Sequence, residues 1–175
     1  TMEWDGADNM GKLFRLDTDQ SWHLLEENIH ITNGMGWNPD KNKFFMIDTL
    51  RQVMYAYDYQ IETGEISNRR IHIQFEENEF PDGMCIDSDG GFWVAMWGGS
   101  KVIHFDKNGL KMLDINMPVS HPTSCCFGGK DMKTLFITSS KLPLTDVEKK
   151  QYPMAGKTFK VETETIGQQQ LQYHG

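Results

Sequence analysis

A residue with a side-chain oxygen occupies the same position in three copies of a repeated sequence pattern. Asn33, Asp82 and Thr123 each stand immediately before a short apolar segment, which is followed by a polar turn and a second apolar segment. In a protein built from such repeats, equivalent positions meet around one axis. Amide and carboxylate oxygens are hard donors, so this ring predicts a site for a divalent cation such as Ca²⁺ or Mn²⁺ rather than a thiolate-bound metal.

The same residues also have a purely conformational interpretation. Asn33-Gly34 is a strong hairpin signal, and Phe80-Pro81-Asp82-Gly83 has the composition of a turn. Each segment taken alone favours a turn without chemistry, whereas their coincidence at one repeat position favours a site. Both interpretations stay open on the sequence alone.

Other motifs that carry chemistry are weaker. Asp87-Ser88-Asp89-Gly90 resembles the start of an EF-hand loop, but Gly98 stands where the final Glu is required, so a turn is predicted. The six His residues lack the spacing of a local zinc motif. A serine hydrolase is disfavoured because the chain has no Gly-x-Ser-x-Gly elbow. Cys125 and Cys126 are predicted to be reduced and to point to opposite faces of a strand.

The segments that must position these residues form a repeat. Four short strand-like segments end on a carboxylate, at residues 11–17, 52–58, 101–106 and 156–162. Their final carboxylates are 41, 48 and 56 residues apart (17 to 58, 58 to 106 and 106 to 162). This spacing is typical of β-propeller blades with variable loops. The predicted fold is therefore all-β, with each repeat a meander of about four strands that stacks on its neighbours.

Composition narrows the class of protein further. The 175 residues are enough for a hydrophobic core, and the net charge of −8 disfavours binding to nucleic acid or to an anionic membrane. No apolar run approaches the length of a membrane span. One short helix is predicted over residues 145–151, ended by Pro153. Together with the reduced thiols, these features predict a soluble, cytoplasmic protein.

Several strings of residues point to a family. They are Asn33-Gly34, Asp58-Tyr59, residues 63–70, Pro81-Asp82-Gly83-Met84-Cys85-Ile86-Asp87, Trp93-Val94-Ala95 and residues 123–129. With these strings the chain resembles the regucalcin (senescence marker protein, gluconolactonase) family, which includes the insect luciferin-regenerating enzymes. The resemblance covers almost the whole chain, and the string from Pro81 to Asp87 is specific to the family.

The resemblance implies a six-bladed β-propeller that hydrolyses sugar lactones with one divalent metal ion, Ca²⁺, Zn²⁺, Mn²⁺ or Mg²⁺, in its central channel. It implies that Asn33 and Asp82 are metal ligands, and that Asp82 is also the catalytic general base. Two other ligands of the family pattern, a Glu and an Asn, have no counterpart in this chain. Glu3 or Asp5 is a candidate for a substrate-binding carboxylate, although the spacing around them departs from the family pattern.

Other functions stay open beside the lactonase. One is a calcium-binding or regulatory role like that of regucalcin, and another is an enzyme of the luciferin-regenerating type without lactonase activity. Chemistry through the thiol of Cys125 or Cys126 is disfavoured, because an acidic chain offers few cations to stabilise a thiolate.

The length of the chain conflicts with a complete ring. Six blades of roughly 45–50 residues need close to 300 residues, so residues 1–175 are expected to be the C-terminal part of one propeller domain, about three to four blades. Open strand edges favour a covering partner. We expect this partner to be the missing N-terminal fragment or a second copy of the chain. Alone, the chain is expected to be inactive on a small-molecule lactone.

Overall fold

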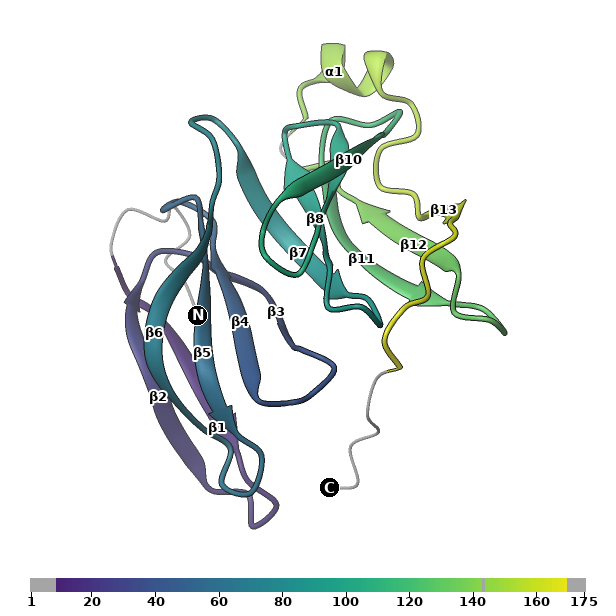
Figure 1. Ribbon diagram of the computed structural model, residues 1–175. Coiled ribbons are helices and arrows are strands. Elements are labelled where there is room, and N and C mark those ends of the chain that lie inside the picture. Colours follow the sequence, from purple (N-terminus) through teal and green to yellow (C-terminus); the bar gives the residue numbers. More distant parts are fainter. Residues whose placement is uncertain (1–8, 143, 170–175) are drawn as a thin grey trace.

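The computed structural model describes residues 9–142 and 144–169, and within them the fold is all-β with one short helix (Figure 1). The strands are β1 (Gly11–Leu16), β2 (Trp22–Ile29), β3 (Thr32–Trp37), β4 (Lys43–Asp48), β5 (Val53–Gln60), β6 (Glu65–Gln74), β7 (Phe80–Ile86), β8 (Phe92–Trp97), β9 (Lys101–Phe105), β10 (Lys111–Asn116), β11 (Pro122–Gly128), β12 (Thr134–Ser139) and β13 (Phe159–Glu162). The predicted all-β class is confirmed.

These strands form four antiparallel sheets. β1 and β2 pair with each other, β3–β6 and β7–β10 form four-stranded sheets, and β11–β13 form a three-stranded sheet. Strands that are adjacent in sequence are adjacent in each sheet, which is the predicted meander. The four predicted segments overlap β1, β5, β9 and β13, but only β13 ends on its carboxylate, Glu162. Asp17 and Asp106 directly follow β1 and β9, and Asp58 lies inside β5.

In the three sheets from β3 onwards, the first strand of one sheet lies against the first strand of the next. β7 contacts both β3 and β11, although the three strands belong to three different sheets. This contact brings equivalent positions of the repeat together, as the propeller prediction requires. We call β3, β7 and β11 the inner strands.

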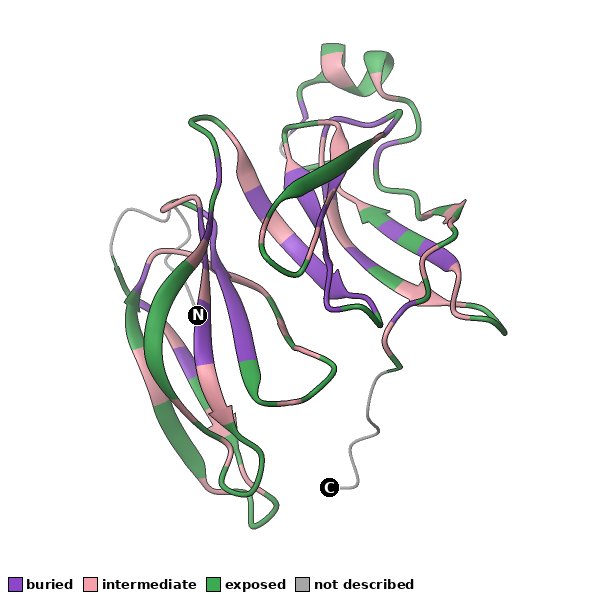
Figure 2. Ribbon diagram, in the orientation of Figure 1, coloured by how far each residue is buried: buried purple, intermediate pink, exposed green. Residues whose placement is uncertain are grey.

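The hydrophobic core fills the spaces between sheets. β8 lies between two sheets, and its side chains are buried from Phe92 to Met96 (Figure 2). Val94 packs towards the β3–β6 sheet with Phe45 and Ile47, whereas Trp93 packs towards the β11–β13 sheet. Because both faces of β8 are buried, its sequence is a continuous apolar run. A neighbouring sheet covers each face, so the sheets are stacked as layers.

Helix α1 (Asp146–Gln151) connects β12 to β13 and agrees with the predicted helix. It begins at Thr145, whose side chain accepts a hydrogen bond from the Glu148 backbone N–H while the Glu148 side chain accepts one from the Thr145 N–H. This capping box satisfies donors that the first turn leaves free. None of the helices among the described residues is long and apolar enough to cross a membrane.

Candidate functional site

Each inner strand has a β-bulge at the same point of the repeat. The pairing of β3 with β4 shows one extra residue on β3 within residues 32–35. β7 has one extra residue against β8 within residues 81–84, and β11 has one against β12 within residues 122–124. A bulge bends the strand and re-aims a side chain. The bulged segments contain the three predicted ring residues, Asn33, Asp82 and Thr123.

The turn interpretation of these segments is wrong. Asn33-Gly34 lies inside β3 and Asp82-Gly83 lies inside β7. Neither glycine has the positive φ that a hairpin turn of this composition requires. Gly83 instead permits a close approach, because a β-carbon there would lie 2.7 Å from the backbone oxygen of Thr123 on β11. Sequence reasoning could not separate these roles, since both use a glycine after a polar residue.

Asn33 and Asp82 form the centre of the candidate site. Burial raises the pKa of Asp82 to about 6, opposed by hydrogen bonds from the Asn33 side chain and the Gly83 backbone N–H. Both donors are neutral, so within the described residues the carboxylate is stabilised by dipoles and not by a cation. A half-buried carboxylate in this setting is a favourable place for a positive ion.

Thr49 positions Asn33, and no motif in the sequence predicts this role. The Asn33 amide Nδ2 donates a hydrogen bond to the Thr49 Oγ1 over 3.2 Å, and that hydroxyl donates to the Pro81 backbone oxygen over 2.8 Å. Thr49 therefore connects β3 to β7 just beside the site. With its amide hydrogens directed to Thr49 and Asp82, Asn33 keeps its carbonyl Oδ1 as the atom for a cation.

Thr123, the third ring residue, has a different environment. Its hydroxyl shares a hydrogen bond with the Thr138 hydroxyl of β12 over 2.8 Å. Thr123 therefore adds a neutral oxygen beside Gly83 and no charge. Glu3 and Asp5, the predicted substrate-binding carboxylates, lie outside the described residues.

The donor set of this site is one carboxylate and one amide oxygen. Within residues 9–142 and 144–169, no three His, Cys, Asp or Glu side chains gather as a metal-binding group. The Asn33 and Asp82 oxygens fit a hard divalent cation such as Ca²⁺, Mg²⁺ or Mn²⁺, and a complete coordination shell needs further ligands.

The three cysteines lie on the inner strands, Cys85 on β7 and Cys125 and Cys126 on β11. The Cys85 and Cys125 Sγ atoms are 3.7 Å apart, and both residues are buried while Cys126 is exposed. The adjacent Cys125 thiol and burial raise the pKa of Cys85 well above its usual value. The opposite orientations predicted for Cys125 and Cys126 are confirmed, whereas the contact with Cys85 joins residues too far apart in sequence to be foreseen.

Stacked four-stranded meanders with polar oxygens at matching bulges of the inner strands define a β-propeller-like protein with a candidate cation site. Residues 1–141 match the family described as SMP-30/Gluconolactonase/LRE-like region. The chain belongs to this family, and the predicted resemblance is confirmed.

Individual relatives agree with this assignment. The chain is 35% identical over 177 residues to Bacillus subtilis YvrE, named as a candidate sugar lactone lactonase, covering 100% of this chain and 61% of the relative. It is 40% identical to regucalcin of Danio rerio, covering 85% of this chain and 51% of the relative. A solved luciferin-regenerating enzyme superposes with a TM-score of 0.86 at 30% identity, covering 95% of this chain and 57% of that one. The chain thus spans about half to three fifths of the length of these relatives.

Proposed function

We propose that this chain is part of a metal-dependent hydrolase that opens sugar lactones, and that Asn33 and Asp82 hold one divalent cation. The observation that carries the proposal is the half-buried, hydrogen-bonded pair of these residues on matching bulges of adjacent inner strands. The family description, which includes gluconolactonase, and the name of the Bacillus subtilis relative support the substrate class.

The chemistry assigns a separate task to each residue. A divalent cation bound at this site would supply Lewis-acid polarisation of the lactone carbonyl. Asn33 offers a neutral oxygen ligand, and Thr49 fixes the orientation of its amide. Asp82 offers a charged ligand and accepts a proton. Its pKa of about 6 without a cation lies in the range of an efficient general base, and falls when a cation is bound beside it.

The reaction is a hydrolysis without a change of oxidation state. Water adds to the lactone carbonyl carbon as Asp82 takes one of its protons. The bond from that carbon to the ring oxygen then breaks, and the ring oxygen receives the proton from Asp82. The product is one open-chain hydroxy acid, and Asp82 returns to its ionised state.

We propose further that the active assembly includes blades beyond those of this chain, supplied by an N-terminal fragment or by a second copy. The two-stranded sheet β1–β2 supports this proposal, because large apolar side chains on it are exposed. Trp22 is 69% exposed, and Phe14, Leu16 and Leu24 are between 42% and 47% exposed. Exposed apolar groups on an open sheet favour a covering surface.

The decisive experiment measures hydrolysis of glucono-δ-lactone with Mn²⁺, Zn²⁺, Ca²⁺ or Mg²⁺, with and without the N-terminal fragment, beside calorimetric titration of each metal. We expect turnover only in the completed assembly. Asp82→Ala should abolish turnover and weaken metal binding together, whereas Asp89→Asn on the exposed β7–β8 turn should change neither. Most of the turnover retained by Asp82→Ala at saturating metal would refute the role of Asp82. Ca²⁺ binding without turnover in every assembly would support a calcium-binding protein instead.

A further inference from the structure

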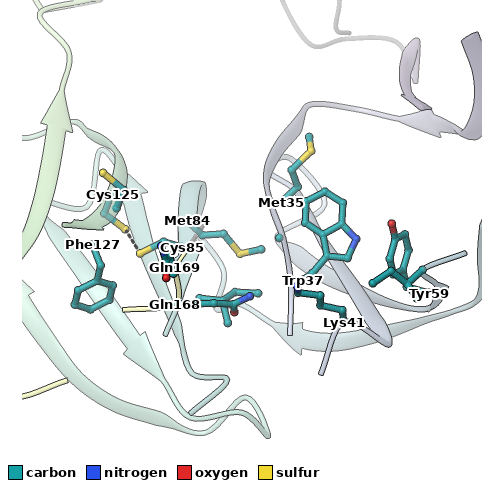
Figure 3. A pocket seen from close by; sticks show the side chains of 14 residues that line it. Met35, Trp37, Lys41, Tyr59, Met84, Cys85, Cys125, Phe127, Gln168 and Gln169 are labelled. Carbon is teal, nitrogen blue, oxygen red and sulfur yellow. Dashed lines mark hydrogen bonds between the residues drawn. The ribbon is translucent and has the colours of Figure 1, made fainter. Parts of the chain in front are cut away.

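Two buried thiols face each other where β7 and β11 meet. The Cys85 and Cys125 Sγ atoms lie 3.7 Å apart, although the residues are 40 positions apart in the sequence. Figure 3 shows the two sulfur atoms turned towards one another. The sulfur atoms of a disulfide are about 2.05 Å apart, so an approach of roughly 1.7 Å would join these two.

The close packing of the two strands produces this contact. A β-carbon at Gly83 would lie 2.7 Å from the Thr123 backbone oxygen, so the two backbones nearly touch there. Cys85 lies two residues after Gly83, and Cys125 lies two residues after Thr123. Side chains two residues apart on a strand point to the same face, which brings both thiols into the same contact. Backbone packing therefore keeps the thiols at a high effective concentration towards each other.

The surroundings of the pair favour neutral sulfur. The Cys125 thiol donates a hydrogen bond to the Trp93 backbone oxygen over 3.0 Å. The Cys125 thiol and burial together raise the pKa of the Cys85 thiol well above its usual value. A scarce thiolate slows oxidation, but a dithiol that is not stabilised in its ionised form also makes the disulfide harder to reduce. We therefore expect a link that forms slowly and persists once formed.

An oxidant can reach the pair through a cavity that both cysteines line. The cavity has a volume of about 490 Å³, whereas a water molecule occupies about 30 Å³ in the liquid, so a small hydroperoxide fits. From this side the oxidant meets Cys85 and Cys125 although they are only 8% and 5% exposed. Cys126 is exposed, but it points to the opposite face of β11 from Cys125, so it is not placed to complete a link with Cys85.

We propose that Cys85 and Cys125 are an oxidation site, at which a hydroperoxide converts the two thiols into a disulfide that joins β7 to β11. The proposal does not rest on the proposed lactonase, because it uses other residues and needs no metal.

The reaction has two steps. One thiolate attacks a peroxide oxygen, the O–O bond breaks, and the sulfur becomes a sulfenic acid while the other oxygen leaves with a proton as water or an alcohol. The second thiol then attacks the sulfenic sulfur. The S–S bond forms, the S–O bond breaks, and the hydroxyl leaves with the proton of the second thiol as water. The two thiols lose two electrons in total, and the hydroperoxide gains them.

The disulfide should stabilise the chain. It would close a loop that spans 40 positions of the sequence, and it would connect two different sheets through their inner strands. Closing a loop of this length restricts the unfolded chain, so the melting temperature should rise by about 8 °C.

The test treats the 175-residue chain with hydrogen peroxide and counts its free thiols in urea. The three free thiols should fall to one, and the mass of the chain should fall by about 2 Da, the mass of the two hydrogens lost. Peptide mapping should find Cys85 joined to the segment that contains Cys125. Dithiothreitol in urea should restore all three thiols, and the refolded chain should regain its original melting temperature.

Variants identify the partners, with Cys126→Ala as the matched control. This variant should lose both of its thiols and gain the same melting temperature as the unchanged chain. Cys85→Ala and Cys125→Ala should each form no link within the chain and show no such gain. Circular dichroism establishes that each variant is folded before the treatment.

The possible results separate clearly. A link in the unchanged chain and in Cys126→Ala supports the proposal, whether or not Cys85→Ala and Cys125→Ala fold and whether or not lactonase activity is found. Oxidation confined to Cys126, a link that Cys126→Ala abolishes, or a link between two chains in place of one within a chain would overturn it. Three free thiols after prolonged treatment would overturn it as well.

Discussion

A β-carbon at Gly34 would lie 2.8 Å from the backbone oxygen of Asp82, on the neighbouring inner strand. It would also lie 2.7 Å from the backbone nitrogen of Met84. The absence of a side chain at Gly34 therefore sets the distance between β3 and β7, and with it the contact of Asn33 with Asp82. Gly83 repeats this arrangement against β11.

Gly34→Ala should consequently destabilise the chain by about 2 kcal/mol, since overpacking against backbone atoms typically costs about 1–3 kcal/mol. Gly36→Ala is the matched control on the same strand. Its β-carbon would meet the flexible end of the Ile86 side chain at 3.1 Å, so a smaller loss is expected. Urea unfolding of the two variants checks this, and equal losses would contradict the close-approach role of Gly34.

Thr49→Val should weaken metal affinity about tenfold while turnover at saturating metal stays within about threefold, because a residue that only orients a ligand acts through that ligand. Thr49→Ser should restore the affinity, since it keeps the hydroxyl that Asn33 and Pro81 use. Calorimetric metal titration and the lactonase assay of the completed assembly separate the two readouts. A loss of turnover that saturating metal does not recover would show that Thr49 has another role.

Much of this arrangement follows from the sequence, because a propeller places equal positions of its repeats around one axis. The predicted ring position coincides with three bulges, and the four predicted strand segments overlap β1, β5, β9 and β13. The roles of Gly34 and Gly83 could not be predicted. A glycine after Asn or Asp is equally suited to a turn and to a close approach between strands.

The features that could not be predicted from the sequence depend on contacts between residues distant in sequence. Thr49 reaches Asn33 only because of the register between β3 and β4, and Cys85 meets Cys125 only because β7 lies against β11. The cavity lined by Trp37 of β3, Cys85 of β7 and Phe127 of β11 likewise combines residues from several sheets. No local pattern specifies such contacts, whereas strands and their repeat are local properties.

The turn between β7 and β8 provides a stability test. Asp87 is 1% exposed, and its carboxylate accepts hydrogen bonds from the Gly91 N–H over 2.8 Å and the Trp93 Nε1 over 3.0 Å. The His104 Nε2 lies 3.2 Å from the same carboxylate. The predicted turn is confirmed, and the carboxylate of its first residue contacts the turn, β8 and β9.

Asp87→Ala should lower the free energy of unfolding by about 3–5 kcal/mol, because it leaves the Trp93 and Gly91 donors buried without an acceptor. Asp89→Ala, in the same turn but with an exposed side chain, should change it by less than about 1 kcal/mol. Thermal unfolding followed by circular dichroism distinguishes the two. Similar melting curves would mean that the buried carboxylate contributes little.

His72 makes stability depend on pH. Its ring lies 5.1 Å from that of Phe45 and 5.2 Å from that of Phe92, and its Nε2 is buried without a partner among the described residues. Burial lowers the pKa of His72 below its usual value, and the charges of Lys43 and Arg70 lower it further. Hydrogen bonding to the Lys107 backbone and the charge of Asp106 oppose the shift without cancelling it.

Between the lowered pKa of the folded chain and about 6.5, the usual value in an unfolded chain, the unfolded state binds more protons than the folded state. The free energy of unfolding is therefore expected to fall as the pH decreases through about 6.5. His72→Phe removes this titration and keeps an aromatic ring between Phe45 and Phe92. The free energy of unfolding of this variant should therefore decline less between pH 8 and pH 5. Urea unfolding across this range measures the difference. Parallel profiles for the two proteins would exclude His72 as the source, because the other titrating groups are the same in both.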